Sequence, residues 1–491
     1  MQNAVAMKIF LITSAAFMAK SIYTGAVFSA YIFLLMDRSN TAVGGITGMS
    51  GLTGLILAPI VGYVSDKWDR AELARFSSLF GVMGLAFAVY AVSQNSFPLM
   101  MLSEVIWGLF WAIFSPTTDA LLADSAEEGT RSKYFTVTTV IKNLASSAGP
   151  LTSLVLFILL GNTWDISICR TVMYVGLGLF VIPLVLLAFF KAPSKHDATN
   201  DGKYGKVSTN ENIDDDDKMA LEMASTHLKN VFSEIHVNDD GALGEEEEKE
   251  EGEELAEMRE REFAKINVQL ESRAEAQDRA HYICGDILLV PAAVAVGDVI
   301  TGLASGMTIK FMPIFMLDML NMTPDKVQIV YTASPLLIAG ATILVTSMSK
   351  TLGRVWATVL SKSIGTSLLL LLAYQAHLYI YYLEEVGLPP EQHPWYCSVP
   401  AILLVFLVRT VIMNTTKPLT RSIVMDAVPR GQRGRWQGLE SVNAATWSGS
   451  AVMGGWLIDK YGFVGVFVAT ALMQALAMVP LMWVSTLVPP E

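Results

Sequence analysis

Four charged side chains interrupt long apolar stretches of the chain: Lys20, Glu104, Asp298 and Arg409. A charge at the depth of a lipid bilayer is costly, so it usually serves binding, proton transfer or pairing. We expect the carboxylates of Glu104 and Asp298 to carry protons, and the two basic groups to bind an anionic or polar part of a substrate. Structural ion pairs that fix the packing of helices are the alternative.

Three more side chains extend this candidate cavity. Lys310 follows Asp298 along the same apolar stretch, where it either contacts substrate or extends its ammonium group to the membrane surface. Trp107 and Trp111 are one helical turn apart and close to Glu104. They either stack on an aromatic substrate or serve helix packing and an interfacial belt.

The elements that position these residues are apolar segments long enough to cross a membrane as helices, which takes about 20 residues. Twelve such segments are present, at 9–36, 42–65, 73–93, 98–123, 136–160, 169–190, 285–316, 326–348, 355–382, 398–425, 437–458 and 462–487. At a rise of about 1.5 Å per residue, Lys20, Asp298 and Arg409 fall near the middle of the membrane, and Glu104 lies about 9 Å below its outer surface.

Composition and the placement of charge agree with this interpretation. Of the residues, 52% are hydrophobic and 16% are charged, whereas soluble domains carry about 25% charged residues. With the N-terminus inside, thirteen Lys and Arg residues, Lys142 and Lys362 among them, are counted in short cytoplasmic loops and four in outer loops. This bias predicts that both termini are cytoplasmic. The first apolar run, 9–36, is too long for a cleavable signal peptide, which predicts a spanning helix.

The segment between the sixth and seventh spans has a different composition. Residues 192–280 hold 25 Asp and Glu against 11 Lys and Arg, a net charge of −14, whereas the whole chain carries −12. Such runs are typical of solvated or disordered chain. Within them, residues 236–247 resemble a calcium-binding EF-hand loop, with Asn238, Asp240 and Glu247 at ligand positions. His236 replaces the essential first Asp and no second loop follows, so we favour a degenerate remnant or simple acidic disorder.

An internal repeat relates the two halves of the chain. Residues 116–131 and 418–433 share the frame P-x-T-x5-D-x4-G-x-R without gaps, at an offset of 302. They lie at the inner ends of the fourth and tenth spans, which predicts that the two halves run in the same direction. We expect the polar residues there to form a cytoplasmic gate, and ordinary solvated loop charge is the alternative. The gate residues are Asp119, Asp124, Arg131, Asp426 and Arg433.

A motif after the second span carries a resemblance to a known family. Residues 62–70, GYVSDKWDR, resemble the major facilitator superfamily's signature G-x-x-x-D-R/K-x-G-R-R/K, from which Asp69 and Ala71 depart. The resemblance implies two six-helix bundles, with spans one, four, seven and ten around a central cavity. It also implies a latch that joins the halves on the cytoplasmic side. The latch residues are Gly62, Asp66, Lys67 and Arg70.

These features together predict an all-α membrane protein with twelve transmembrane helices. Its parts are an N-terminal six-helix bundle (1–191), an acidic cytoplasmic linker (192–283) and a C-terminal six-helix bundle (284–491). The predicted function is secondary active transport of a small solute by alternating access, coupled to protons. A transporter-like receptor or scaffold that signals through its cytoplasmic loop is one alternative, and an uncoupled facilitator is another.

Other classes of protein are not indicated. The sequence holds no P-loop, dinucleotide fingerprint, nucleophile elbow or metal-spaced His cluster. We therefore expect no enzyme activity, no cofactor and no nucleic-acid partner. The expected partners are the lipid bilayer, a small-molecule substrate and protons, and the expected state is a monomer.

Overall fold

The computed structural model describes residues 2–124, 131–190, 289–417, 419–420, 423–424 and 446–487, and the regular elements in these ranges are helices. Contacts divide the chain into two units. The first combines Met1–Ala192 with Ala280–Glu491, and the second is Pro193–Arg279. The whole second unit lies outside the described residues, and so do the candidate calcium ligands Asn238, Asp240 and Glu247.

The N-terminal half of the first unit covers the first six predicted spans. The helices α1 (Gln2–Thr24) and α2 (Ala26–Leu35) together form the first span, and α7 (Ile166–Leu179) and α8 (Val181–Ala188) form the sixth. The four spans between them are α3 (Asn40–Lys67), α4 (Arg70–Ser93), α5 (Phe97–Asp124) and α6 (Arg131–Leu160).

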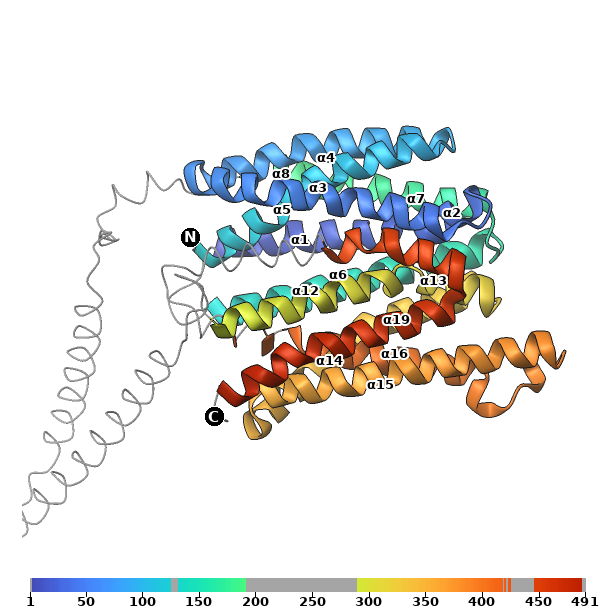
Figure 1. Ribbon diagram of the computed structural model, residues 1–491. Coiled ribbons are helices and arrows are strands. Elements are labelled where there is room, and N and C mark those ends of the chain that lie inside the picture. Colours follow the sequence, from blue (N-terminus) through green and yellow to red (C-terminus); the bar gives the residue numbers. More distant parts are fainter. Residues whose placement is uncertain are drawn as a thin grey trace, which may run out of the picture. The chain divides into compact units, whose positions relative to one another are not determined.

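The C-terminal half begins with α12 (Leu289–Ile309), which continues through α13 (Met312–Ile314) and a π-helical turn at Phe315–Met319. The longer helices that follow are α14 (Pro324–Leu352), α15 (Arg354–Ile380) with a π-helical turn at Tyr381–Glu385, α16 (Val399–Thr415) and α19 (Ala451–Leu487). The chain of α19 reverses direction at Gly462, whose φ is 70° (Figure 1). This single element therefore holds part of the eleventh span and all of the twelfth.

Helix length and apolarity confirm a multi-pass membrane fold. Within the described ranges, nine helices are long and apolar enough to cross a membrane. The helix α3 is not among the nine, α16 is shorter with 17 residues, and the two arms of α19 are counted as one. The described helices therefore fit the twelve predicted spans, of which the tenth and eleventh lie partly outside the described residues.

Two aspartates, Asp69 and Asp165, cap the N-termini of helices. Neither was predicted from the sequence to have this role. Asp69 accepts hydrogen bonds from the backbone N–H groups of Ala71 and Glu72 at the start of α4. Asp165 accepts from Ser167 at the start of α7, and these hydrogen bonds lower the pKa of its carboxyl group. A carboxylate at this position satisfies free N–H groups and meets the positive end of the helix dipole. Asp69, which departs from the signature motif, therefore caps a helix.

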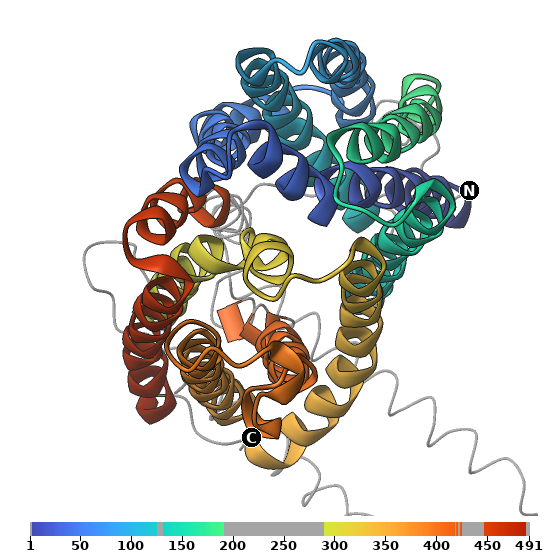
Figure 2. The ribbon, with the colours of Figure 1, turned by 90° about the vertical axis from the view of Figure 1, so that its right-hand side faces the viewer.

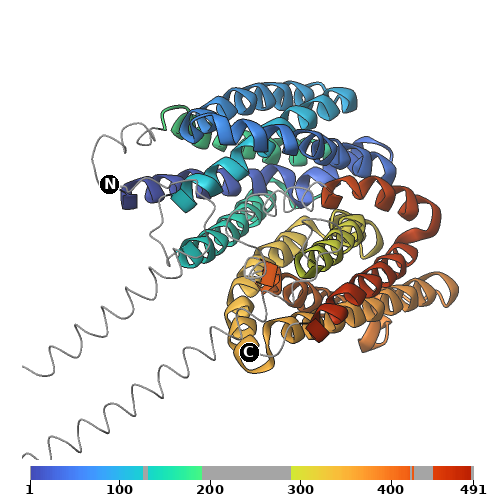
Figure 3. The ribbon, with the colours of Figure 1, turned by 60° about the vertical axis from the view of Figure 1, so that its left-hand side comes forward.

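The helices of the first unit gather in two groups. Seen end-on, α1 to α8 lie on one side and α12 to α19 on the other (Figure 2), and a second view shows the same division (Figure 3). The groups meet where α3 packs on α19 and where α6 packs on α14. Large apolar side chains such as Leu159 and Ile343 are exposed on the helices, as expected of surfaces that face lipid.

Candidate functional site

Three charged side chains that are far apart in the sequence come together in the structure. Lys20 lies on α1, Glu104 on α5 and Lys310 at the C-terminal end of α12, so both halves contribute. The charges of Lys20 and Lys310 both act on Glu104, and Lys20 is acted on by Lys310 and Glu104. All three are half-buried. They thus form one mixed-charge cluster at the junction of the halves, which we call the central cluster.

Each lysine of the central cluster stands over a tryptophan ring. The Lys20 Nζ lies 3.8 Å from the ring centroid of Trp111. Trp111 follows Glu104 on α5 after seven residues, which is about two helical turns. The Lys310 Nζ lies 4.5 Å from the ring centroid of Trp447. Such cation–π contacts stabilise an ammonium group without neutralising it. The lysine of each half is therefore oriented by an aromatic ring of the same half.

The carboxyl group of Glu104 has partners of its own. The Ser50 hydroxyl of α3, which donates to the backbone oxygen of Thr47 at 3.3 Å, and the Tyr23 phenol of α1 both lie within its electrostatic reach. The backbone of α3 can approach because Gly108 lies one turn after Glu104. A Cβ atom on Gly108 would lie 2.8 Å from the backbone oxygen of Ser50, closer than packed atoms tolerate. A glycine therefore lets the hydroxyl of Ser50 lie near Glu104.

A second glycine positions Trp447 under Lys310. Gly306 lies one turn before Lys310 on α12, and a Cβ atom there would overlap the backbone carbonyl oxygen of Trp447 and the hydroxyl of Ser450. Only a residue without a side chain lets these two segments pack at this distance. The ring of Trp447 reaches Lys310 because of that close approach.

Replacing Gly306 with Ala should therefore destabilise the protein by about 1–3 kcal/mol, the usual range for overpacking. It should also move Trp447 away from Lys310 and change the tryptophan fluorescence. Gly340→Ala is the matched control, since nothing lies within 4 Å of the added methyl group on α14. Thermal unfolding in detergent compares the two variants, and equal stabilities would contradict this packing argument.

Trp107 lies in the core of the N-terminal half, away from Lys20. Its buried ring is 4.7 Å from that of Phe180 and 5.6 Å from that of Phe110. The Nε1 atom of Trp107 has no hydrogen-bond partner among the described residues. Together with Glu104 and other residues, Trp107 lines a cavity of about 10 Å³. Of the two tryptophans predicted at the site, only Trp111 contacts a charged member of the central cluster.

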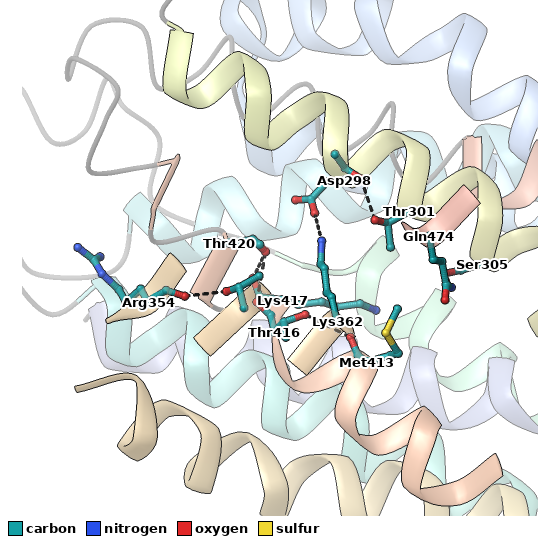
Figure 4. A network of polar contacts seen from close by, with 12 residues as sticks. Asp298, Thr301, Ser305, Arg354, Lys362, Met413, Thr416, Lys417, Thr420 and Gln474 are labelled. Atoms are coloured by element: carbon teal, nitrogen blue, oxygen red, sulfur yellow. Dashed lines mark hydrogen bonds and ion pairs between the residues drawn. The ribbon is translucent and has the colours of Figure 1, made fainter. Parts of the chain in front are cut away.

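Asp298 pairs with Lys362 and lies apart from the central cluster. Their Oδ1 and Nζ atoms are 3.0 Å apart and join α12 to α15 (Figure 4). The side chain of Lys362 is 5% exposed and that of Asp298 is 29% exposed. The sequence-based count of Lys362 among the loop charges is wrong: Lys362 lies inside α15, which begins at Arg354, just as the predicted span 355–382 implies. Twelve residues of helix, about 18 Å, separate Asp298 from Lys310.

Asp119, predicted as a gate residue, pairs within its own half. Its Oδ1 lies 3.1 Å from Nζ of Lys142, which joins α5 to α6. Lys142 also stands 5.5 Å from the ring centroid of Phe17 on α1. Like Lys362, Lys142 was counted among the loop charges, and the structure places it inside a helix. The ion pair fixes helices of one half to each other.

Arg409 is the most deeply buried of the predicted charges, with 2% of its surface exposed. It lies on α16 one turn before Met413, whose side chain packs beside Gly365 of α15. Its Nε and Nη2 atoms have no hydrogen-bond partner in the described part of the chain. Burying a guanidinium group without partners is costly. Arg409 is therefore a candidate for contact with an incoming anion.

The remaining predicted gate and latch residues are Arg70, whose side chain is half-buried, and seven others. Arg70 begins α4. The backbones of five others lie in α3, α5 or α6, and their side chains fall outside the described part of the structure: Gly62, Asp66, Lys67, Asp124 and Arg131. Asp426 and Arg433 lie outside the described residues. In the ranges that are described, no three His, Cys, Asp or Glu residues gather to hold a metal ion.

A carboxylate closes the junction of the halves at the end of the bundle opposite both chain termini. Asp459 of α19 meets the first turn of α3, where its Oδ1 accepts from the backbone N–H and the side-chain amide of Asn40 at 3.1 and 3.0 Å. Its Oδ2 accepts from the backbone N–H and the hydroxyl of Thr41 at 2.8 and 2.6 Å. One carboxylate thus satisfies four donors of the other half at a helix N-terminus.

Three weaker contacts join the halves at the same end. Arg38 and Asp318 form an ion pair of 3.0 Å between exposed side chains, which contributes little by itself. Trp164 donates to the backbone oxygen of Met322 at 2.8 Å. The backbone N–H of Asp325 donates to the side-chain oxygen of Asn162 at 3.0 Å. We call these contacts and those of Asp459 the far-side clasp.

Sequence reasoning missed several residues of this arrangement. Ser50 and Trp447 complete the central cluster, but a hydroxyl or a tryptophan in an apolar helix carries no signal that tells a site from packing. Asp459 precedes a Lys-Tyr-Gly turn and is indistinguishable in sequence from a loop charge. Asp69 did have a signal, because Asp-Arg-Ala-Glu at 69–72 fits the pattern of a helix start.

Sequence comparisons relate the chain to known proteins. A model of the Major Facilitator Superfamily matches residues 9–237 and 294–491. Among curated proteins, the chain is similar to YqjV of Bacillus subtilis (strain 168), described as an uncharacterized MFS-type transporter, with 30% identity over 124 residues. The matched stretch covers 25% of this chain and 30% of that protein.

Solved structures show the same fold at low identity. The chain is similar to a bacterial homologue of the iron transporter ferroportin, with 10% identity over 98% of this chain and 99% of that chain. The TM-score is 0.61 for the inward-facing state and 0.56 for the outward-facing state. It is also similar to a bacterial homolog of the human lysosomal transporter Spinster in an inward-facing, unoccupied conformation, with a TM-score of 0.61 and 12% identity over 99% and 97% of the two chains.

Proposed function

Because the chain belongs to the major facilitator superfamily, we propose that it moves a small solute across a membrane by alternating access, coupled to protons. The observation that carries this proposal is the central cluster. It brings one carboxylate and two ammonium groups from both halves to one place, and all three side chains are half-buried. A site built from both halves changes its surroundings whenever the halves move relative to each other, which is what alternating access requires.

The far-side clasp supports a closed junction at one end of the bundle. Asp459 and the contacts around it join the two halves at the end opposite the chain termini. The better agreement with the inward-facing than with the outward-facing ferroportin homologue, 0.61 against 0.56, fits such a state. In this proposal the clasp is the outer gate, and it opens when the cytoplasmic side closes.

The orientation in the membrane is part of the proposal. Both chain ends in the first unit lie at the same end of the bundle (Figure 1). Even without Lys142 and Lys362, which lie well inside helices, eleven Lys and Arg residues remain on the side of the membrane predicted to be cytoplasmic, against four on the other. The positive-inside rule then places both termini and the acidic segment 193–279 in the cytoplasm. The protein would act as a monomer in the bilayer.

Glu104 is the better candidate for the proton carrier. The carboxylate of Asp298 is held by Lys362 within the C-terminal half. The carboxylate of Glu104 instead faces lysines of both halves, so its surroundings depend on the conformation of the transporter. A proton site must sense conformation in order to couple proton movement to solute movement. We therefore assign proton coupling to Glu104 and helix fixation to Asp298.

Transport assays test the proposed function directly. The full chain in proteoliposomes would be offered sugars, amino acids, carboxylates and organic cations, with and without a pH gradient. Accumulation of one solute only in the presence of the gradient is the expected result. Equal uptake with and without the gradient would identify an uncoupled facilitator. Absence of uptake for every solute would contradict the proposal and favour a receptor.

The far-side clasp gives a separate prediction. Asp459→Asn should open that end, because hydrogen bonds to a charged acceptor contribute about 1.5–3 kcal/mol each. Loss of even one of the four hydrogen bonds to Asp459 should raise the population of molecules that are open at this end at least about tenfold. Distances between spin labels at Gln94 and Glu391, exposed positions in loops at that end of each half, measure the opening once the three native cysteines are replaced.

The neighbouring Lys460→Gln variant is the control for this measurement. Lys460 stands over the rings of Trp456 and Tyr461 in its own half, with centroid distances of 5.0 and 5.2 Å. Its removal should leave the distance distribution unchanged. An unchanged distribution in the Asp459 variant would show that the carboxylate does not hold the halves together.

A further inference from the structure

The central cluster has an unequal number of positive and negative groups. Lys20 and Lys310 act on Glu104, and within the described part of the chain the charges that act on the two lysines are those of the cluster itself. The further groups facing Glu104 are the neutral Ser50 hydroxyl and the Tyr23 phenol. One carboxylate is therefore shared by two ammonium groups, and the cluster carries a net charge of +1 when Glu104 is ionised.

On the basis of the proposed function, we propose that the solute is an anion and that it competes with the carboxylate of Glu104 for Lys20 and Lys310. When Glu104 is ionised, its negative charge offsets part of the positive charge of the two ammonium groups. When Glu104 takes up a proton, it becomes a neutral carboxylic acid, and the ammonium groups are free to bind a carboxylate or phosphate group of the solute. Each bound anionic group thus requires one proton, which makes the protein a proton–anion symporter.

The charge balance of the cluster favours this exchange. The empty form holds two ammonium groups and one carboxylate, a net charge of +1. The loaded form holds two ammonium groups, a neutral acid and one anionic group of the solute, again +1. The two forms that must reorient therefore present the same charge to the membrane interior. The form that has taken up only a proton carries +2, and an extra charge at this depth is costly. The form that has bound only the anion carries no net charge, but it holds two anionic groups at the same two lysines, where they repel each other. Proton and anion should therefore move only together.

The aromatic rings fit an anion better than a cation. Trp111 and Trp447 already carry the two lysines on their faces, at 3.8 and 4.5 Å. A cationic solute would have to displace these lysines or approach them against their repulsion. An anion meets two ammonium groups that are already oriented by the rings, and ion pairs with such pre-oriented donors are strong. A carboxylate and a phosphate both carry the negative charge and the acceptor oxygens that such ammonium groups bind.

Binding to the purified full chain in detergent tests this inference without requiring transport. Thermal unfolding would be followed at constant ionic strength with succinate, glutamate and phosphate, and with succinamide and choline as neutral and cationic controls. At least one anion should stabilise the wild type, and its apparent affinity should rise by up to about tenfold per pH unit as the pH falls, the limit for one coupled proton. Glu104→Gln should bind that anion at every pH without this dependence.

The lysine variants complete the test. Lys20→Gln and Lys310→Gln should lose the stabilisation, whereas Lys8→Gln, an exposed lysine on α1, should keep it. If a glutamine variant fails to fold, Lys20→Arg and Lys310→Arg should retain binding because they keep the charge. Stabilisation by choline or succinamide alone, an unchanged pH dependence in Glu104→Gln, or no stabilisation of Glu104→Gln by any anion would overturn the inference.

The outcomes separate this inference from the proposed function. Anion binding with the expected pH dependence, but without transport in proteoliposomes, would support the inference and contradict the proposed function. Proton-coupled uptake of a cation or a neutral solute would support the proposed function and contradict the inference.

Discussion

Uptake driven by a pH gradient should fall to the level of protein-free liposomes when Glu104 is replaced by Gln. The amide cannot take up or release a proton, so the gradient can no longer act on the cluster. Exchange of solute for solute should continue, because Lys20 and Lys310 stay in place and a permanently neutral side chain resembles the protonated acid. The measurement is accumulation of the transported solute, with and without a gradient, next to exchange of internal for external solute.

The control for this experiment is a glutamate that has the same chemistry in a different place. Glu72 lies exposed in the first turn of α4, where it meets Arg75 at 3.5 Å. Glu72→Gln should leave gradient-driven accumulation unchanged. If Glu104→Gln still accumulates solute against its gradient, another group carries the proton. Loss of both accumulation and exchange in Glu104→Gln would assign Glu104 to solute binding in place of proton coupling.

Asp298→Asn should have the largest effect on stability. The variant leaves the ammonium group of Lys362 buried without its counter-charge, and breaking a buried ion pair from one side typically costs about 3–5 kcal/mol. The side chain of Lys362 is 5% exposed, so water offers little replacement. Thermal or denaturant unfolding in detergent, read as a loss of helical signal, measures the effect.

The structure also predicts an asymmetry between the two partners of this pair. Lys362→Met leaves the carboxylate of Asp298, which is 29% exposed and can keep part of its hydration, so this variant should lose less stability than Asp298→Asn. The double variant Asp298→Asn with Lys362→Met removes both charges and should recover most of the loss. Proton coupling in the surviving folded protein should persist. Loss of coupling with normal stability would instead make Asp298 the proton carrier.

The helical membrane fold could be predicted because it depends on a property that sequence displays directly. A helix that crosses a bilayer must be apolar over about 20 residues, whatever its neighbours are. The charges within these helices were equally visible, and Lys20 and Glu104 do meet in the structure. The helix α3 is only weakly apolar, but it could still be predicted as a span, because Gly and Thr residues are typical of a helix that packs closely against other helices. The structure shows this packing for α3.

The pairing of charges could not be predicted, because it depends on how each helix is rotated about its axis. Asp298 looked equivalent to Glu104 in sequence, and only the packing of α12 on α15 assigns it to Lys362. Lys362 and Lys142 were misplaced although the predicted spans 355–382 and 136–160 contain them. Both were counted with the charges of the cytoplasmic loops, whereas the structure places them 8 and 11 residues after the first residues of α15 and α6.

Proton exchange on solute binding tests the central claim most directly. The purified protein would be mixed with a transported solute in weakly buffered detergent solution, and a pH indicator would count the protons that it takes up or releases. The account predicts that the wild type takes up about one proton per bound solute near the pH at which Glu104 titrates, and that Glu104→Gln binds the same solute with no proton exchange. Binding without proton exchange in the wild type, or equal exchange in both proteins, would contradict it.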